Sequence, residues 1–594
     1  MSTNQPPTGP PSGPPLGPPP SGPPPSGPPP SASQPPGSAE VLERGGGGPL
    51  PPGPPPTGSG GAGRKGLILG GVIGVLAVGG AAFGAYSWLT STGPQPAEAL
   101  PADTLGYVSI DLDPSGSQKI AALKTLEKFP AADEWLDEEG IGSGDDIRKF
   151  IFGKIQEEEG ACEDLDFDDD IKPWLGDRFA VAAIDDDGDD ETPVPVGVVQ
   201  IRDADEAQDR AEKVIEDCGG DPDDGGLAVS GDWLIIAETD EIAEQVVDDA
   251  AEASLADDDE FQKWTEAAGD PGILTAYASA EAGKVLIEEL GSFGSALGSG
   301  GSSDCATSED FADGCLSFEE GIEEDIVPDD AAKALEDFEG LALTVRFDDG
   351  SLEVEMASGM KDLGFNSLSS DAAGEAIATL PEGTAAAIGL GFEPGWAEEL
   401  LDYVGSMSGT GADIEGFLDE AERTFDLSLP EDLETLFGES AAIAVSSDFD
   451  PEVFFGSESG VNLPIGAKVK GDPEAIQDVI DKVKATAPSP EEAEIFSTES
   501  EGDYIVIGPD TDYLSELLDD GELGDSDTYQ DVVRDDDAAS IFFIDFDAGD
   551  GWLASLAGDD VEVKENLEPL AGLGLTGWQD DDETGHVVLR VTTD

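Results

Sequence analysis

Basic side chains are scarce in this sequence. It has 27 Lys and Arg against 132 Asp and Glu, for a formal net charge of −105 over 594 residues. Binding to nucleic acid needs clustered Lys and Arg that neutralise phosphates, so we expect no nucleic-acid partner. We expect the acidic surface to be simply solvated; the alternative is that it binds divalent cations weakly. Charge of this size says little about the fold.

Histidine and cysteine are almost missing as well. The only histidine, His586, lies in GHVVLRV, which is typical of a strand, so we expect a plain strand residue rather than a member of a catalytic triad. The four cysteines, Cys162, Cys218, Cys305 and Cys315, include no Cys-x-x-Cys pair, which argues against zinc. Their even number and expected position outside the membrane predict two disulfides. Of the three possible pairings, proximity favours Cys305 with Cys315, leaving Cys162 with Cys218.

Recognisable ligand motifs are missing too. Neither GxxxxGK[ST] nor GxGxxG opens a helix after a predicted strand. The acidic segments 166–170 and 185–190 are rich enough in Asp for calcium, but they fail the EF-hand spacing, since Ile171 and Ala183 occupy required positions. We expect solvated loops there, with weak irregular cation sites as the alternative. No catalytic, cofactor or metal residues are predicted.

Charged residues are absent from segment 66–89, which begins GLILGGVIGVL. Its length suffices to cross a hydrocarbon core of about 30 Å, so it predicts one transmembrane helix. Arg64 and Lys65 precede it, and no Lys or Arg follows before Lys119. The positive-inside rule therefore predicts a single-pass protein of the cell membrane, with a cytoplasmic N-terminus and an extracytoplasmic C-terminal part. A cleaved signal peptide ending near residues 97–99 is the alternative, although such peptides lie closer to the N-terminus.

The N-terminal segment 1–63 is rich in Pro and Gly, but glycine does not recur at every third position, which excludes collagen. This composition predicts a disordered cytoplasmic tail, either passive or bound by a proline-reading module. Residues 90–99 are expected to form a linker after the membrane segment.

The remaining sequence contains an internal repeat, with copies at 100–362 and 380–594. LPADTLGYVSIDLDPSG matches LPEGTAAAIGLGFEPGW, and EGLALTVRFDDGSLEVEMAS matches AGLGLTGWQDDDETGHVVLRVT; six such blocks follow one another in the same order. Extra residues in the first copy hold or adjoin three of the cysteines. We therefore expect the disulfides to close loop-like insertions rather than to hold the shared fold.

Both copies predict mixed secondary structure. Short apolar segments such as 196–201 and 233–238 favour strands, whereas 203–218 has the spacing of an amphipathic helix with an Asp cap. From Val196 the predicted order resembles a split β-α-β unit. Segment 341–357 predicts a hairpin with an Asp-Gly turn. The predicted fold class is α+β, as two sequence-related repeats with mainly antiparallel sheets.

The segment GPQPAEALPADTLGYVSIDLDPSG resembles actinobacterial membrane proteins of a domain-of-unknown-function family, number 3352. The resemblance covers the apolar segment and essentially the whole acidic part. It implies an actinobacterial envelope location and carries no activity, cofactor or catalytic residue.

The leading functional hypothesis is a non-catalytic ectodomain that binds or scaffolds, with an envelope protein as its partner. A carrier of lipid or another apolar ligand is the second hypothesis, and a carboxylate-based hydrolase is the third. A large apolar cavity would favour the carrier, and an open cleft with two inward carboxylates of raised pKa would favour the hydrolase.

Overall fold

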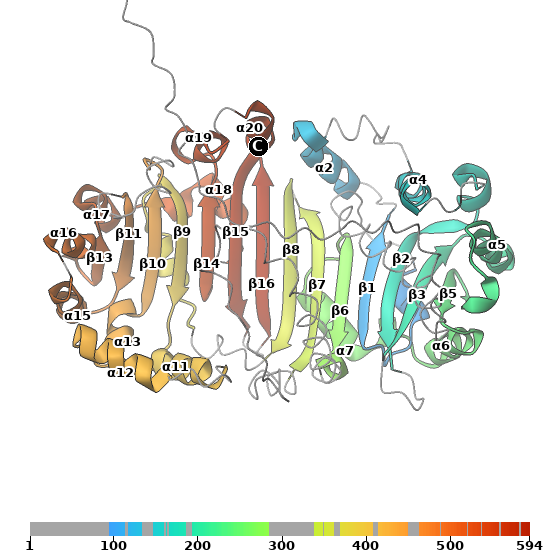
Figure 1. Cartoon of the computed structure of the whole chain (residues 1–594), viewed down its shortest axis with the longest axis horizontal. Coiled ribbons are helices and arrows are strands. Elements are labelled where there is room, and N and C mark those ends of the chain that lie inside the picture. The colour runs from blue at the N-terminus through green and yellow to red at the C-terminus, as the bar shows by residue number, and fades with distance from the viewer. Residues whose placement is uncertain are drawn as a thin grey trace, which may run out of the picture. The chain divides into compact units, whose positions relative to one another are not determined.

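Sixteen strands form one antiparallel sheet in the computed structural model of this chain (Figure 1). The described residues are 94–112, 117–132, 146–159, 162, 165–185, 193–283, 338–348, 350–360, 369–407, 414–449, 463–487, 489–519, 521–535, 537–557, 560–580 and 584–594. All of them belong to one unit, Gly61–Asp594. We call residues 94–360 the first half and 369–594 the second half.

The first half contributes eight strands, which run from the middle of the sheet outward in the order β8, β7, β6, β1, β2, β3, β5 and β4. Their bounds are β1 Gly106–Asp111, β2 Leu175–Ile184, β3 Val194–Ile201, β4 Gly226–Ser230, β5 Trp233–Ala237, β6 Leu274–Ser279, β7 Phe338–Asp348 and β8 Ser351–Met360.

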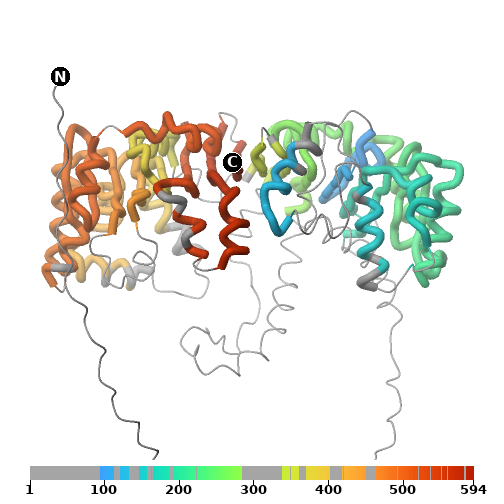
Figure 2. The backbone as a smooth tube through the Cα atoms, turned by 90° about the horizontal axis from the view of Figure 1, so that it is seen from above, coloured from blue at the N-terminus to red at the C-terminus, as the bar shows by residue number. Residues whose placement is uncertain are grey.

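The second half contributes the other eight strands, in the order β16, β15, β14, β9, β10, β11, β13 and β12 from the middle outward. Their bounds are β9 Thr384–Gly391, β10 Ser440–Ser446, β11 Ile465–Lys470, β12 Ser497–Glu501, β13 Tyr504–Gly508, β14 Ser540–Asp545, β15 Leu570–Gln579 and β16 Gly585–Thr593. Counted outward from the middle, β9 of the second half therefore holds the same position in the strand order as β1 of the first half, and β16 holds the same position as β8. The C-terminus consequently lies near the middle of the sheet (Figure 2).

The fold class predicted from the sequence is wrong, because the two halves do not form separate sheets. β8 and β16 pair with each other in antiparallel register over seven residue pairs, from Gly585 opposite Ser358 to Val591 opposite Leu352. An unpaired edge strand exposes N–H and C=O groups, and joining two such edges satisfies them. Pairing between strands more than 200 residues apart leaves no local sequence signal.

Membrane-spanning structure was the other part of that prediction. No helix in the described ranges is both long and apolar enough to cross a membrane. The predicted membrane segment 66–89 and the predicted tail 1–63 both lie outside the described residues. Residues 96–99, assigned to a linker from the sequence, form the 3-10 helix η1 (Pro96–Ala99), and Ala97 and Ala99 are buried in the core.

Helices cover both faces of the sheet. On one face, η1, α6 (Asp240–Glu252) and α7 (Asp259–Ala267) pack on the first half, and α10 (Ala373–Ile377), α17 (Thr511–Leu518) and α18 (Asp527–Val532) pack on the second. The others are α2 Ser117–Leu126, α4 Ile147–Glu159, η2 Phe167–Ile171, α5 Ala204–Asp217, α11 Trp396–Met407, α12 Ile414–Phe425, α13 Glu431–Phe437, α15 Pro473–Ala485, α16 Pro490–Ala493, α19 Ala548–Ser555 and α20 Val561–Leu567.

Local signals explain where several elements begin and turn. The side chains of Asp203, Thr239 and Asp258 accept hydrogen bonds from the first turns of α5, α6 and α7, as N-caps do. The predicted Asp-Gly hairpin joins β7 to β8: Asp348 pairs with Ser351, and Gly350 has a φ of +96°, which glycine adopts readily.

Candidate functional site

A solvent-open groove of ≈ 990 Å³ lies on the face that η1 and α7 cover, in the first half. Its floor is made by side chains of the central strands, and its walls come from η1, from α7 and from the loop 269–271 that follows α7. Phe261 of α7 forms an apolar wall and is itself held edge-on by Tyr107 and Tyr277, at centroid distances of 5.6 and 5.0 Å.

The groove floor is one row of polar residues across neighbouring strands. Ser109 of β1 is the register partner of Thr275 in β6, which in turn pairs with Thr344 in β7. Thr344 pairs with Glu355 in β8. Because directly opposed residues in an antiparallel pair lie on the same face of the sheet, these four side chains line one continuous track. In the described part of the chain, the hydroxyls of Thr275 and Thr344 have no hydrogen-bond partner.

The same row continues into the second half, where Thr576 carries the only polar side chain of the four equivalent positions. Val588 opposes Glu355 across the junction, Thr576 opposes Val588, and Ile541 opposes Thr576. Ile541 and Thr576 are fully buried. Gly389 in β9, the counterpart of Ser109, opposes Ile541.

α10 closes the row over Gly389. A Cβ placed on this glycine would come within 3.0 Å of the Ile377 side chain, so the helix packs directly on the strand. The shared architecture therefore does not require a groove at this position. Polar residues on β1 and β6 distinguish the first half from the second.

Five charged side chains form what we call the central charge cluster, at the end of the groove: Arg346, Glu353, Glu355, Arg534 and Arg590. Glu353 is fully buried, and its carboxylate oxygens lie 2.5 Å from Arg346 Nη2, 3.1 Å from Arg590 Nε and 3.3 Å from Arg534 Nε. Arg346 also forms an ion pair with Glu355. Three arginines against two glutamates leave one net positive charge, in a chain whose total is −105.

Backbone groups complete the surroundings of Arg346. Its Nη1 donates to the carbonyl oxygens of Ala268 and Asp270, at 3.2 and 3.1 Å. Burial opposes its charge, yet the bonds to Glu355 and Glu353 raise the pKa of the guanidinium overall. Gly269, at φ +81°, lies against this pair, and a Cβ there would come within 2.5 Å of Glu355 Oε2. Only glycine fits between the loop and the cluster.

An aromatic pair occupies the corresponding place in the second half. Arg346 and Glu353 are register partners in the β7–β8 hairpin, and Trp578 and His586 are partners at the equivalent step of β15–β16. Their rings stack at a centroid distance of 4.9 Å. His586 Nε2 lies 3.1 Å from Asp580 Oδ2. His586 therefore lies in a strand, as its sequence context predicts.

Arg534 connects the cluster to solvent. It follows α18, its backbone N–H donates to Thr576 Oγ1 at 3.3 Å, and its side chain is 38 % exposed. Its Nε faces Glu353, the residue lines the groove, and its terminal nitrogens have no partner among the described residues. The sequence analysis missed this site. The one available signal was charge in β8, where Glu353 and Glu355 alternate with apolar residues inside a strand.

Residues 68–463 match the family described as "Protein of unknown function (DUF3352)". This match covers two thirds of the chain. The chain belongs to the DUF3352 family. Neither a curated protein nor a solved structure matches it. The matched range of this DUF3352 chain contains every groove residue of the first half, whereas Arg534 and Arg590 lie beyond it.

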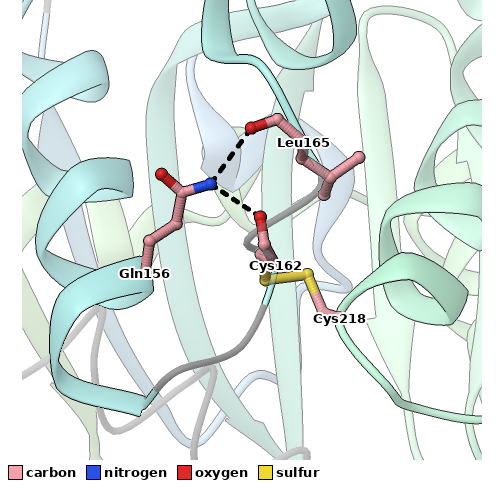
Figure 3. The surroundings of a disulfide bond; sticks show 4 residues. All are labelled: Gln156, Cys162, Leu165 and Cys218. Atoms are coloured by element: carbon pink, nitrogen blue, oxygen red, sulfur yellow. Dashed lines mark hydrogen bonds between the residues drawn. A yellow bond between two sulfur atoms is a disulfide. The ribbon is translucent and has the colours of Figure 1, made fainter.

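The predicted disulfide between Cys162 and Cys218 is present in this DUF3352 chain (Figure 3). Cys218 caps the C-terminus of α5, and Gln156 of α4 donates to the carbonyl oxygens of Cys162 and Leu165, at 2.6 and 3.0 Å. The bond thus fastens the segment between α4 and η2 to α5. Cys305 and Cys315 lie outside the described residues.

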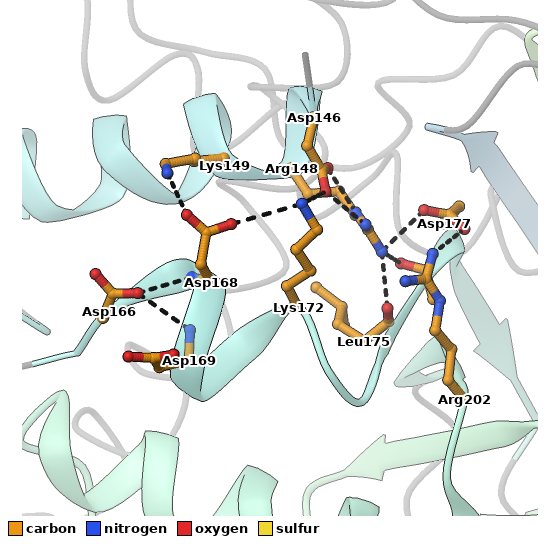
Figure 4. A network of polar contacts seen from close by, with 11 residues as sticks. Asp146, Arg148, Lys149, Asp166, Asp168, Asp169, Lys172, Leu175, Asp177 and Arg202 are labelled. Carbon is orange, nitrogen blue, oxygen red and sulfur yellow. Dashed lines mark hydrogen bonds and ion pairs between the residues drawn. The ribbon is translucent and has the colours of Figure 1, made fainter. Parts of the chain in front are cut away.

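The acidic segment 166–170 forms η2 and is engaged by protein groups (Figure 4). Asp168 lies 2.5 Å from Lys149 Nζ, and this bond lowers the pKa of the carboxyl. Asp170 accepts from the backbone N–H of Asp166, which lowers its pKa, and it pairs with Lys213 at 3.0 Å. Asp168 and Asp170 are therefore paired with lysines of the protein.

Metal ligands do not gather in the described ranges: no group of three or more His, Cys, Asp or Glu there could hold an ion. The second acidic segment, 185–190, lies outside the described residues after Asp185. Near η2, Arg148 binds backbone groups of the sheet. Its guanidinium donates to the carbonyl oxygens of Leu175 and Gly176, at 2.7 and 2.9 Å, where the β2–β3 register is interrupted (Figure 4).

Proposed function

We propose that this DUF3352 chain is a cell-envelope protein that binds a small ligand, without catalysis, in the groove of its first half. One observation carries the proposal. Ser109 and Thr275 present hydroxyls to an open groove, whereas the equivalent positions Gly389 and Ile541 are covered or buried. At these positions one of two similarly built halves keeps a groove that the other fills, which points to a use of the groove rather than to a need of folding.

The groove's character supports binding over the two alternatives. Its volume falls in the range typical of small-molecule sites, about 300–1,000 Å³. Hydroxyls, carboxylates and guanidinium groups line it beside Phe261 and Tyr107, which suits a polar ligand better than a lipid chain. Glu355, the carboxylate deepest in the row, forms an ion pair with Arg346 and holds it in place, a different task from attacking or protonating a substrate.

Location at the cell membrane remains part of the proposal, and so does the orientation that places the groove outside the cytoplasm. The charge-free segment 66–89 and the preceding Arg64 and Lys65 support both. An envelope protein as partner and a cytoplasmic proline-reading module at residues 1–63 are further proposals. Protease added to intact cells with the wall opened is expected to remove a tag placed after Asp594. Protection of that tag would refute the orientation.

Groove filling tests the binding function directly. Thr275→Ile places in the first half the residue type that Ile541 supplies in the second, and it should remove ligand binding while the melting temperature changes little. The assay is isothermal titration calorimetry on the full chain with small amino acids, dipeptides and disaccharides. Thr435→Ile on α13, in the second half, is the control and should bind as the unmodified chain does. A ligand bound equally well by Thr275→Ile would refute the groove as its site.

A further inference from the structure

We propose that the groove takes a short zwitterionic ligand, an amino acid or a short peptide with a free carboxylate and a free ammonium group. This inference rests on the proposed function and assigns its ligand class. Three observations carry it: a guanidinium with free donors at one end, carboxylates along the rim, and hydroxyls between them.

Arg534 is the residue that binds the carboxylate of the ligand. Glu353, which is buried, lies 3.3 Å from Nε of its guanidinium. Arg534 lines the groove, and its terminal nitrogens have no partner among the described residues. A planar guanidinium with free parallel donors matches a carboxylate in two hydrogen bonds, which gives the strongest and most directional pairing available to this ligand.

Rim carboxylates supply the complementary charge. Glu98 of η1, Glu266 of α7 and Asp270 of the following loop all line the groove. With Glu355 they make four acids against two arginines, Arg346 and Arg534, a balance of −2. A ligand carrying only negative charge, such as inorganic phosphate, is therefore repelled. A ligand that places its carboxylate at Arg534 and its ammonium group at the rim carboxylates pairs with groups of both charges.

Hydroxyls of the floor suit the middle of such a ligand. Thr275 has a donor and an acceptor free of described partners, and a peptide group needs one of each. Phe261 gives an apolar wall for a small side chain. A neutral sugar could also bond to the floor, but it would leave the guanidinium of Arg534 and the rim carboxylates without charged partners.

Titration calorimetry on the full chain tests the ligand class with four probes. These are dialanine, dialanine amide, N-acetyl-dialanine amide and maltose. We expect dialanine to bind at least tenfold more tightly than either capped form. Arg534→Gln should abolish the preference for dialanine over dialanine amide, because only the free carboxylate uses the guanidinium. Arg423→Gln, on α12, removes the same charge away from the groove and should leave the preference intact.

Different results separate the two levels of the proposal. Maltose binding that Thr275→Ile abolishes, with no binding of dialanine, would overturn the zwitterionic class and leave the groove function standing. Equal affinity for dialanine and its amide, or an unchanged preference in Arg534→Gln, would refute the assignment of Arg534 as the residue that binds the ligand's carboxylate. If no probe bound in a way that Thr275→Ile altered, the groove function and the ligand class would both fail.

Discussion

Glu353→Gln is expected to destabilise the chain more than any other single isosteric change in the described sheet. Glu353 is fully buried between Arg346, Arg534 and Arg590, with its oxygens 2.5 to 3.3 Å from their nitrogens. Glutamine keeps the shape but leaves three guanidinium groups facing a neutral amide. Removing one partner of a buried ion pair costs about 3–5 kcal/mol, since the remaining charge stays desolvated. Whole domains are stable by only about 5–15 kcal/mol, so the variant should lose a large share of its stability.

Urea unfolding followed by circular dichroism measures this loss, with His586→Gln as the matched control. His586 holds the equivalent register position in the second half, where a ring stack replaces the charges. Losing that stack should cost only about 1 kcal/mol. Combining Glu353→Gln with Arg590→Met should cost less than the sum of the two single changes, by about 1–3 kcal/mol. If Glu353→Gln and His586→Gln lowered the free energy of unfolding equally, the cluster would not be the buried charge centre described here.

Three other predictions concern the rest of the chain. Burial first, and then the neighbouring Asp594, raise the pKa of Asp547 from 3.8 to about 6. The folded state therefore keeps a proton that the unfolded chain loses, so the contribution of Asp547 to stability is fully present below about pH 4 and is lost as the pH rises from about 4 to about 6. Because Asp547 is largely exposed, solvent screening limits the loss to below about 1 kcal/mol, and Asp547→Asn should flatten it in thermal melts across that range; an unchanged slope would contradict the assignment. Replacing Cys162 and Cys218 by Ser opens a loop with a sequence separation of 56 residues, which in the chain-entropy model lowers the free energy of unfolding by about 4 kcal/mol; equal stability of the double variant in urea titrations would refute that contribution. Salt should raise the melting temperature, since a net charge of −105 repels itself and the Debye length shrinks from about 30 Å at 0.01 M to about 3 Å at 1 M; a flat curve in scanning fluorimetry would count against self-repulsion.

Features governed by neighbouring residues could be predicted from the sequence. The β7–β8 hairpin follows from the Asp-Gly turn, and the N-cap of α5 follows from Asp203. The Cys162–Cys218 bond follows from an even cysteine count together with the closeness of the other two cysteines in the sequence. The continuous sheet could not be predicted. It depends on the pairing of β8 with β16, which lie far apart in the chain and whose local patterns fit any neighbouring strand.

The groove depends on register in the same way. Ser109, Thr275 and Thr344 are unremarkable hydroxyl residues in three separate strands, and only the ladder pairings place them in one row. Arg534 follows α18 in the second half and reaches the groove of the first half only because the strands meet in the middle. Sequence spacing carries no information about such an encounter.

The junction between β8 and β16 also bears on how such a chain can diverge. If two identical copies met edge to edge about a two-fold axis, each residue on the axis would face itself, and a glutamate there would oppose a glutamate. Like charges directly opposed across strands are destabilising. Covalent fusion removes this restriction, because each copy then mutates alone. Here Glu355 faces Val588, Glu353 faces Arg590, and Ala357 faces His586. A fused pair of copies can therefore evolve a charge cluster on one side of the junction, whereas a symmetric homodimer cannot.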